Sequence, residues 1–299
     1  MSSSEGPTGC SSVLRRTPSG DCWFRDETRH DCSIHRLFGE IELPSACRHF
    51  PRIVVISDDR VAVSLSHYCP TAAAALFKEA DSIRAVDFPR AFPKDRPYEG
   101  LDVRGAYSPL LRPGVILGAD GLRVFERGAI RLLSESDSVW DAIARISRAV
   151  EIARTWTPAD GDLADHVANA FGQGVDASSV TPEFEDPRPV LAAAVAGPPP
   201  GSARLPGGPL LEAVFGARVD AALRRYLAAR LFAAWIVHQS EDLATLVAYL
   251  RLCLSTVFLF AQSRPDLTDE IERYREAVRS SDLWILHFAD PEKLARNLR

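Results

Sequence analysis

The sequence predicts a mainly α-helical protein, in which a small cysteine-rich metal-site region with a β-hairpin precedes a helical C-terminal body. Apolar residues recur at intervals of three and four in several long segments, as in helices, whereas only two short stretches have the pattern of hairpins. Five of the six cysteines lie within the first 69 residues, which sets this region apart. The chain has 299 residues, of which 46% are hydrophobic and 25% charged, so it can bury a substantial core.

Charge and hydropathy narrow the class of protein. A net charge of -5 argues against a basic surface that binds nucleic acid. The first 17 residues lack the apolar stretch of a secretory signal. The most apolar run, Leu243–Ala261, is interrupted by Arg251, so we expect a buried helix and not a membrane span. We therefore expect a cytoplasmic protein without nucleic-acid or membrane partners.

Two short helices are expected around the second and third cysteines of the crowded region. Cys32 precedes the segment 33–38, which Gly39 would end. Cys47 lies in a second short helix, between Pro44 as a helix-starting residue and Pro51 as its stop.

A β-hairpin and a third helix follow. The runs 53–56 and 61–65 flank the turn sequence Ser-Asp-Asp-Arg at 57–60, and this hairpin would bring Cys47 and Cys69 back together. Cys69 precedes Pro70 and an Ala-rich run at 71–80, which predicts a helix N-cap. A thiolate there is stabilised by the helix dipole, which favours its role as a ligand.

We expect four parts along the chain. They are a cysteine-cluster region over residues 1–80, an irregular segment with a short hairpin and a helix over 81–180, a Pro/Gly-rich linker over 181–209 and a helical bundle over 210–299. The linker contains eight Pro and four Gly.

Several elements are expected within these later parts. They are a hairpin over 114–125 around an Ala119–Gly121 turn, a helix over 136–156, a short docked helix over 190–196, and three helices over 210–238, 242–262 and 267–288. We expect Asp242 to cap the second of these three helices and Asp266 or Thr268 the third. The glycines of 114–125 do not match a nucleotide-binding fingerprint.

Five cysteines crowded into the start of a chain without a signal sequence indicate a metal or iron–sulfur site more than a disulfide framework. No two of them have the two-residue spacing of a zinc knuckle, so scattered free thiols remain the alternative. Cys253 lies in an apolar helix and is expected to be a core thiol, while Cys10 is undecided. The neighbouring histidines are candidate supplementary ligands: His30, His35, His49 and His67.

An ordered set of motifs carries a family resemblance. The motifs are Cys22-Trp23-Phe24, Asp31-Cys32-Ser33-Ile34-His35, Phe38-Gly39-Glu40, the segment from Leu43 to Arg52, and Ser66-His67-Tyr68-Cys69-Pro70. This order resembles the cysteine-cluster family that includes the YkgJ-type proteins and the flagellin lysine N-methylases. The resemblance implies that Cys22, Cys32, Cys47 and Cys69 bind one zinc ion or iron–sulfur cluster.

The resemblance also leaves two functions open. One is a metal-cluster protein that binds a protein partner. The other is an enzyme that transfers methyl groups from S-adenosylmethionine to lysines of flagellin or another protein. The family's dense upstream cysteine motif is represented here only by Cys10, and the sequence shows no acid–base pair or cofactor fingerprint. We therefore expect the binding role and assign no catalytic residue.

Overall fold

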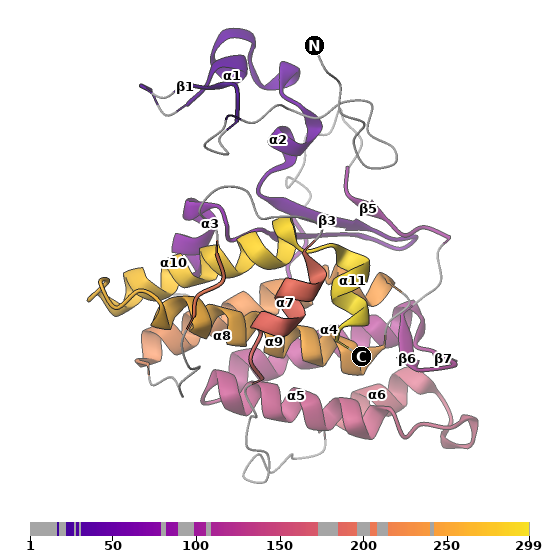
Figure 1. Ribbon diagram of the computed structural model, residues 1–299. Helices are drawn as coiled ribbons and strands as arrows, with labels where there is room; N and C mark the ends of the chain where they lie inside the picture. The colour runs from indigo at the N-terminus through magenta and orange to yellow at the C-terminus, as the bar shows by residue number, and fades with distance from the viewer. Residues whose placement is uncertain are drawn as a thin grey trace. The chain divides into compact units, whose positions relative to one another are not determined.

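A computed structural model describes most of the chain (Figure 1). The described residues are 17, 22–26, 28–29, 31–78, 82–88, 99–105, 109–172, 185–195, 204–207, 215–239 and 242–298. The chain divides into two compact units. Unit 1 comprises residues 1–50 with 197–205, and unit 2 comprises 51–196 with 206–299. The division falls at residue 50. Residues 51–80 therefore belong with the helical body, whereas the sequence had placed them in the cysteine-cluster region.

Unit 1 is built from short elements. They are the antiparallel strands β1 (Arg25–Asp26) and β2 (Asp31–Cys32), the helix α1 (Ser33–Phe38), the 3-10 turn η1 (Glu40–Glu42) and the helix α2 (Ser45–His49). Cys32 is the N-cap residue of α1, and Gly39 ends it with a φ of 84°, as predicted. None of the described residues from 22 to 50 is buried. Side-chain packing alone therefore does not hold this unit together.

Unit 2 begins with a small sheet in the order β4-β3-β5. Its strands are β3 (Arg52–Ile56), β4 (Val61–Leu65) and β5 (Leu101–Asp102), with β3 antiparallel to β4 and parallel to β5. The expected hairpin is confirmed, because Arg52 pairs with Leu65 and the Ser57 N–H donates to Arg60 O at 2.9 Å across the turn. The helix α3 (Pro70–Leu76) follows, with Cys69 as its N-cap residue.

Most of the other described elements of unit 2 are helices, which confirms a mainly α protein. They are α4 (Gly118–Glu135), α5 (Val139–Ala153), η2 (Pro158–Asp160), α6 (Leu163–Gly172), α7 (Arg188–Ala194), α8 (Ala217–Leu231), η4 (Trp235–His238), α9 (Leu243–Gln262), α10 (Glu270–Asp282), the π-helical η5 (Leu283–Phe288) and α11 (Pro291–Arg296). A second hairpin joins β6 (Leu110–Arg112) to β7 (Val115–Ile116).

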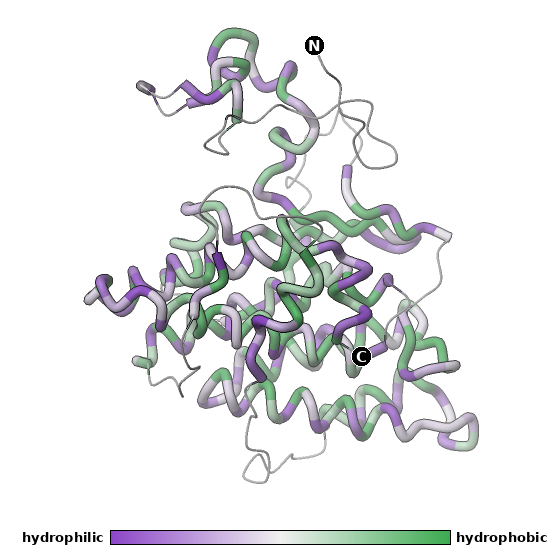
Figure 2. Tube along the Cα trace, viewed as in Figure 1, coloured by the Kyte–Doolittle hydropathy of each residue, from purple (hydrophilic) through white to green (hydrophobic). Residues whose placement is uncertain are grey.

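The core of unit 2 is organised around α9. This helix packs against α10, α5 and α8, and Figure 1 shows it between α10 and α5. It is one helix of the described chain that is long and apolar enough to cross a membrane, but 83% of its apolar window is buried inside the protein, as expected for a core helix. The peripheral helix α5 alternates polar and apolar residues in Figure 2, because only one of its faces is buried.

Several predicted helices are confirmed, with shifts at their ends. The predicted 136–156 helix is α5, and Asp242 caps α9 by accepting from the N–H groups of Ala244 and Thr245. The docked helix within the predicted linker is α7, which buries Leu191. The helix α10 is capped by Asp269 and not by Asp266 or Thr268, because the chain turns again before the helix begins.

Two predictions about local structure are wrong. Residues 118–135 form the helix α4, where a hairpin around Ala119–Gly121 was expected. The hairpin lies earlier, with Gly114 at a φ of 79° in its turn. The helix expected over 210–238 ends at Leu231, because Ala233 adopts a left-handed φ of 62° before η4.

Candidate functional site

Three of the predicted ligands belong to unit 1, and its hairpin brings two of them together. The Arg25 N–H donates to the Cys22 carbonyl at 3.0 Å, and Arg25 pairs with Cys32 in the β1–β2 register. The Ser33 N–H also donates to Phe24 O at 2.9 Å, which holds the start of α1 against the turn after Cys22. Cys22 and Cys32 thus lie at the same end of one hairpin.

The third cysteine joins this neighbourhood from α2. Partial desolvation raises the pKa of the Cys47 thiol, and the charges of the Cys22 and Cys32 thiolates raise it further. The Cys47 thiol therefore lies within electrostatic range of the Cys22 thiol and of the Cys32 thiol. Soft thiolates are the donor set that zinc and iron–sulfur clusters accept. The chemistry of the three side chains therefore fits the predicted site.

The arrangement is a neighbourhood and not an assembled coordination sphere. Among the described residues, no group of three or more His, Cys, Asp or Glu side chains is placed to hold a metal ion. His35 is exposed beside the cysteines. Cys10 and His30 lie outside the described residues.

Cys69 and Cys253 belong to unit 2. Cys69 starts α3, with the Ala73 N–H donating to its carbonyl at 2.9 Å. Its membership of the metal site stays a prediction from the sequence. Cys253 is fully buried in α9, where burial raises its pKa to about 12. It is the core thiol that its apolar surroundings predicted.

A buried polar network anchors the segment that precedes Cys69. The His67 N–H donates to Asp282 Oδ2 at 2.5 Å, and the His67 Nδ1 lies 3.4 Å from the same oxygen. The Tyr226 hydroxyl donates to Asp282 Oδ1 at 2.8 Å, and the Arg230 guanidinium lies 3.6 Å from it. Asp282 is 0% exposed, so three elements converge on one buried carboxylate.

The charges in this network compensate one another. Burial raises the pKa of the Asp282 carboxyl, but Arg230 and the hydrogen bonds from His67 outweigh it and leave the pKa below its ordinary value. Burial likewise opposes the charge of Arg230, yet the Asp282 carboxylate raises its pKa overall. Burial lowers the pKa of His67, so its imidazole is neutral at pH 7. Asp282 and Arg230 form the ion pair of this site.

Two further contacts fix the same segment to the C-terminal helices. Ser66 Oγ lies 3.0 Å from His287 Nε2, and Arg279 Nε donates to the Tyr68 carbonyl at 3.2 Å. The segment 66–69 is therefore held by side chains from 279 to 287, more than 200 positions later in the chain. Asp282, Arg230 and Tyr226 were not singled out in the sequence, because their role depends on this packing.

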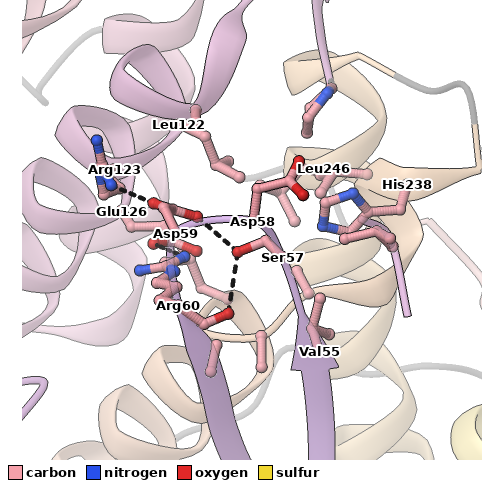
Figure 3. Close-up of a pocket in the computed structure, with 18 residues that line it drawn as sticks. Val55, Ser57, Asp58, Asp59, Arg60, Leu122, Arg123, Glu126, His238 and Leu246 are labelled. Atoms are coloured by element: carbon pink, nitrogen blue, oxygen red, sulfur yellow. Dashed lines mark hydrogen bonds and ion pairs between the residues drawn. The ribbon is translucent and has the colours of Figure 1, made fainter. Parts of the chain in front are cut away.

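A cavity of about 110 Å³ with both polar and apolar lining residues lies beside the β3–β4 turn (Figure 3). Two of its carboxylates, Asp59 and Glu126, are paired with other lining residues. Ser57 Oγ donates to Asp59 Oδ1 at 2.6 Å, Arg60 pairs with Glu126 at 2.5 Å, and Arg123 pairs with Asp59. Burial raises the pKa of Glu126, although Arg60 opposes the shift. The Ser-Asp-Asp-Arg sequence at 57–60 thus forms the predicted turn, and these contacts stabilise it.

A larger cavity of about 580 Å³ lies on the other face of the same hairpin sheet. It is lined by β4, by the described segment 82–88, by α8 and by Phe232. The arginines Arg52, Arg84 and Arg225 contribute to its wall. Its size is that of a small-molecule site.

No family model, no curated protein and no solved structure matches this chain.

Proposed function

We propose that the protein binds zinc or an iron–sulfur cluster through Cys22, Cys32 and Cys47, and that the metal orders unit 1 for contact with a protein partner. The observation that carries this proposal is that three thiols share one neighbourhood in a unit whose described residues include none that is buried. A segment this small gains too little from packing to offset the entropy of ordering its chain. Metal ligation supplies that missing free energy in small cysteine-rich units.

The partner-binding part of the proposal rests on the surface of unit 1. Several large apolar side chains are exposed there, among them Leu37, Phe38 and Ile41, at 62%, 67% and 65%. Exposed apolar side chains that gather on one small unit are typical of a protein contact. The same residues sit on α1 and η1, next to Cys32, so loss of the metal would disturb this surface.

Anaerobic purification of the full chain, followed by metal analysis and a visible absorption spectrum, tests the metal. We expect bound zinc without visible absorption, or bound iron with the broad absorption of a cluster. Cys22→Ser and Cys47→Ser should lose most of the metal. Cys253→Ala is the matched control, because its thiol is buried in α9, and it should retain the metal. Folded protein that is metal-free, or serine variants with full metal content, would contradict the proposal.

Methyl transfer to lysine remains a second proposal that rests on the family resemblance alone. The described residues supply no assigned catalytic group for it. It would use S-adenosylmethionine and a protein substrate such as flagellin, and a direct assay is given in the Discussion.

A further inference from the structure

The cavity of about 580 Å³ in unit 2 combines an apolar wall with positive charge. In β4, Val61, Val63, Ser64 and Leu65 line the cavity; Ser64 is buried, whereas the three apolar side chains are partly exposed. Alternate residues of a strand share one face of the sheet, and the solvent face is ordinarily polar. Val61 and Val63 pack against the buried Val54 and Ile56 of β3, so this side of the hairpin gives the cavity an apolar wall.

The opposite side of the cavity extends the apolar surface. Ile130 of α4 and Phe232 contribute from the helical body. Val86 and Phe88 contribute from the segment 82–88, and they are 62% and 64% exposed. Large apolar side chains in a concavity of this volume provide the burial that a small organic ligand needs.

The charged residues of the cavity all have the same sign. Arg52, Arg84 and Arg225 line it, and no carboxylate is among its described lining residues. Arg225 is fixed by donating from Nη1 to the Leu76 carbonyl at 2.6 Å. Burial and the neighbouring Arg224 lower the pKa of Arg225, so an anion beside it would relieve both effects. Guanidinium groups bind carboxylates, sulfonates and phosphates through paired hydrogen bonds.

We propose that this cavity binds an amphipathic organic anion, with an acyl or aryl body against β4 and Phe232 and its anionic group at the arginines. The apolar wall and the arginines each call for a different part of the ligand. A purely apolar ligand would make no use of the positive charge of the cavity, and an inorganic anion would leave the apolar wall in water. This site lies wholly within unit 2 and does not depend on the metal.

The test uses the full chain and the fluorescence of 8-anilinonaphthalene-1-sulfonate, an aryl sulfonate that brightens in apolar sites. Dodecanoate should displace the probe, whereas inorganic phosphate and decanol at the same concentration should not. Displacement by decanol as effective as by dodecanoate would overturn the role of the charge. Displacement by phosphate alone would overturn the role of the apolar body.

Two variants and two matched controls locate the binding. Arg84→Ala and Val63→Asp should each weaken probe binding at least tenfold, the first by removing a cation and the second by placing a carboxylate in the apolar wall. Arg148→Ala removes an arginine and Ile116→Asp places a carboxylate at an apolar position, both at exposed sites outside the cavity, and these variants should bind as the native protein does. Circular dichroism checks that all four variants fold. Folded cavity variants with unchanged affinity would overturn the proposal.

Discussion

The carboxylate of Asp282 accepts the backbone N–H of His67 at 2.5 Å, which joins positions 215 residues apart. Because Asp282 also pairs with Arg230, the segment that leads to Cys69 is tied to the buried charge of the helical body. Backbone groups that a buried charge holds do not move independently of it. The geometry before Cys69 is therefore set by residues of α8 and α10.

Replacing Asp282 with Asn should destabilise the protein by about 3–5 kcal/mol, because it leaves the buried guanidinium of Arg230 without its counter-charge. Urea denaturation followed by circular dichroism measures the change. Asp266→Asn is the matched control, since Asp266 pairs with Arg264 at 2.7 Å on the surface, and its unfolding midpoint should not move. Equal midpoints for the two variants would show that the buried pair contributes little.

Stability should fall as the pH drops from 7 to 5, and His238 should contribute to that fall. Burial first, and the charge of Arg60 second, lower its pKa below 6.5 in the folded protein. The unfolded chain therefore binds a proton that the folded protein does not, and the stabilisation present above pH 6.5 is lost below it.

In the variant His238→Gln, the stability of the protein should depend less on pH between 7 and 5. Thermal unfolding at pH 7, 6 and 5 gives the comparison. If the unfolding temperature of His238→Gln falls with pH as steeply as that of the native protein, other groups cause the pH dependence of stability.

Chelation should open unit 1 to proteases and leave unit 2 intact. Unit 1 has no buried residue among those described, whereas unit 2 has the core around α9. We expect trypsin to cleave after Arg36 and Arg48 faster once a chelator has removed the metal. Cleavage after Arg148, within α5, is the internal control and should stay slow. If unit 1 resists trypsin equally with and without chelator, the metal does not order it.

Methyl transfer is tested with labelled S-adenosylmethionine and co-expressed flagellin. Because the proposed role is metal-dependent binding, we expect no transfer by the metal-replete native protein. Transfer by the native protein but not by Cys47→Ser would establish the enzyme and place the cluster in its function. Transfer by both proteins would separate the activity from the cysteines.

Local signals in the sequence predicted much of the secondary structure. Asp242 before an apolar run predicted the cap of α9, and the Ser-Asp-Asp-Arg turn between two β-branched runs predicted the β3–β4 hairpin. The helix α4 was missed because Ala119-Asp120-Gly121 suggested a turn, although Leu122, Phe125 and Ala129 recur at helical spacing. Periodicity was the stronger signal there.

The buried network was not predicted, because it depends on how distant segments pack. One local signal does exist. Asp282 lies four residues after Val278, which lies four after Tyr274, so a carboxylate falls on the apolar face of a helix. Its partners Arg230 and His67 come from other elements, and no spacing within α10 identifies them. The left-handed Ala233 that ends α8 is likewise a consequence of tertiary packing.

X-ray absorption at the edge of the bound metal determines whether Cys22, Cys32 and Cys47 bind one metal. We predict three or four sulfur neighbours at about 2.3 Å in the native protein and at least one fewer in Cys47→Ser. Cys253→Ala should give the native spectrum. A first shell of only nitrogen and oxygen, or the same sulfur count in Cys47→Ser as in the native protein, would contradict the account.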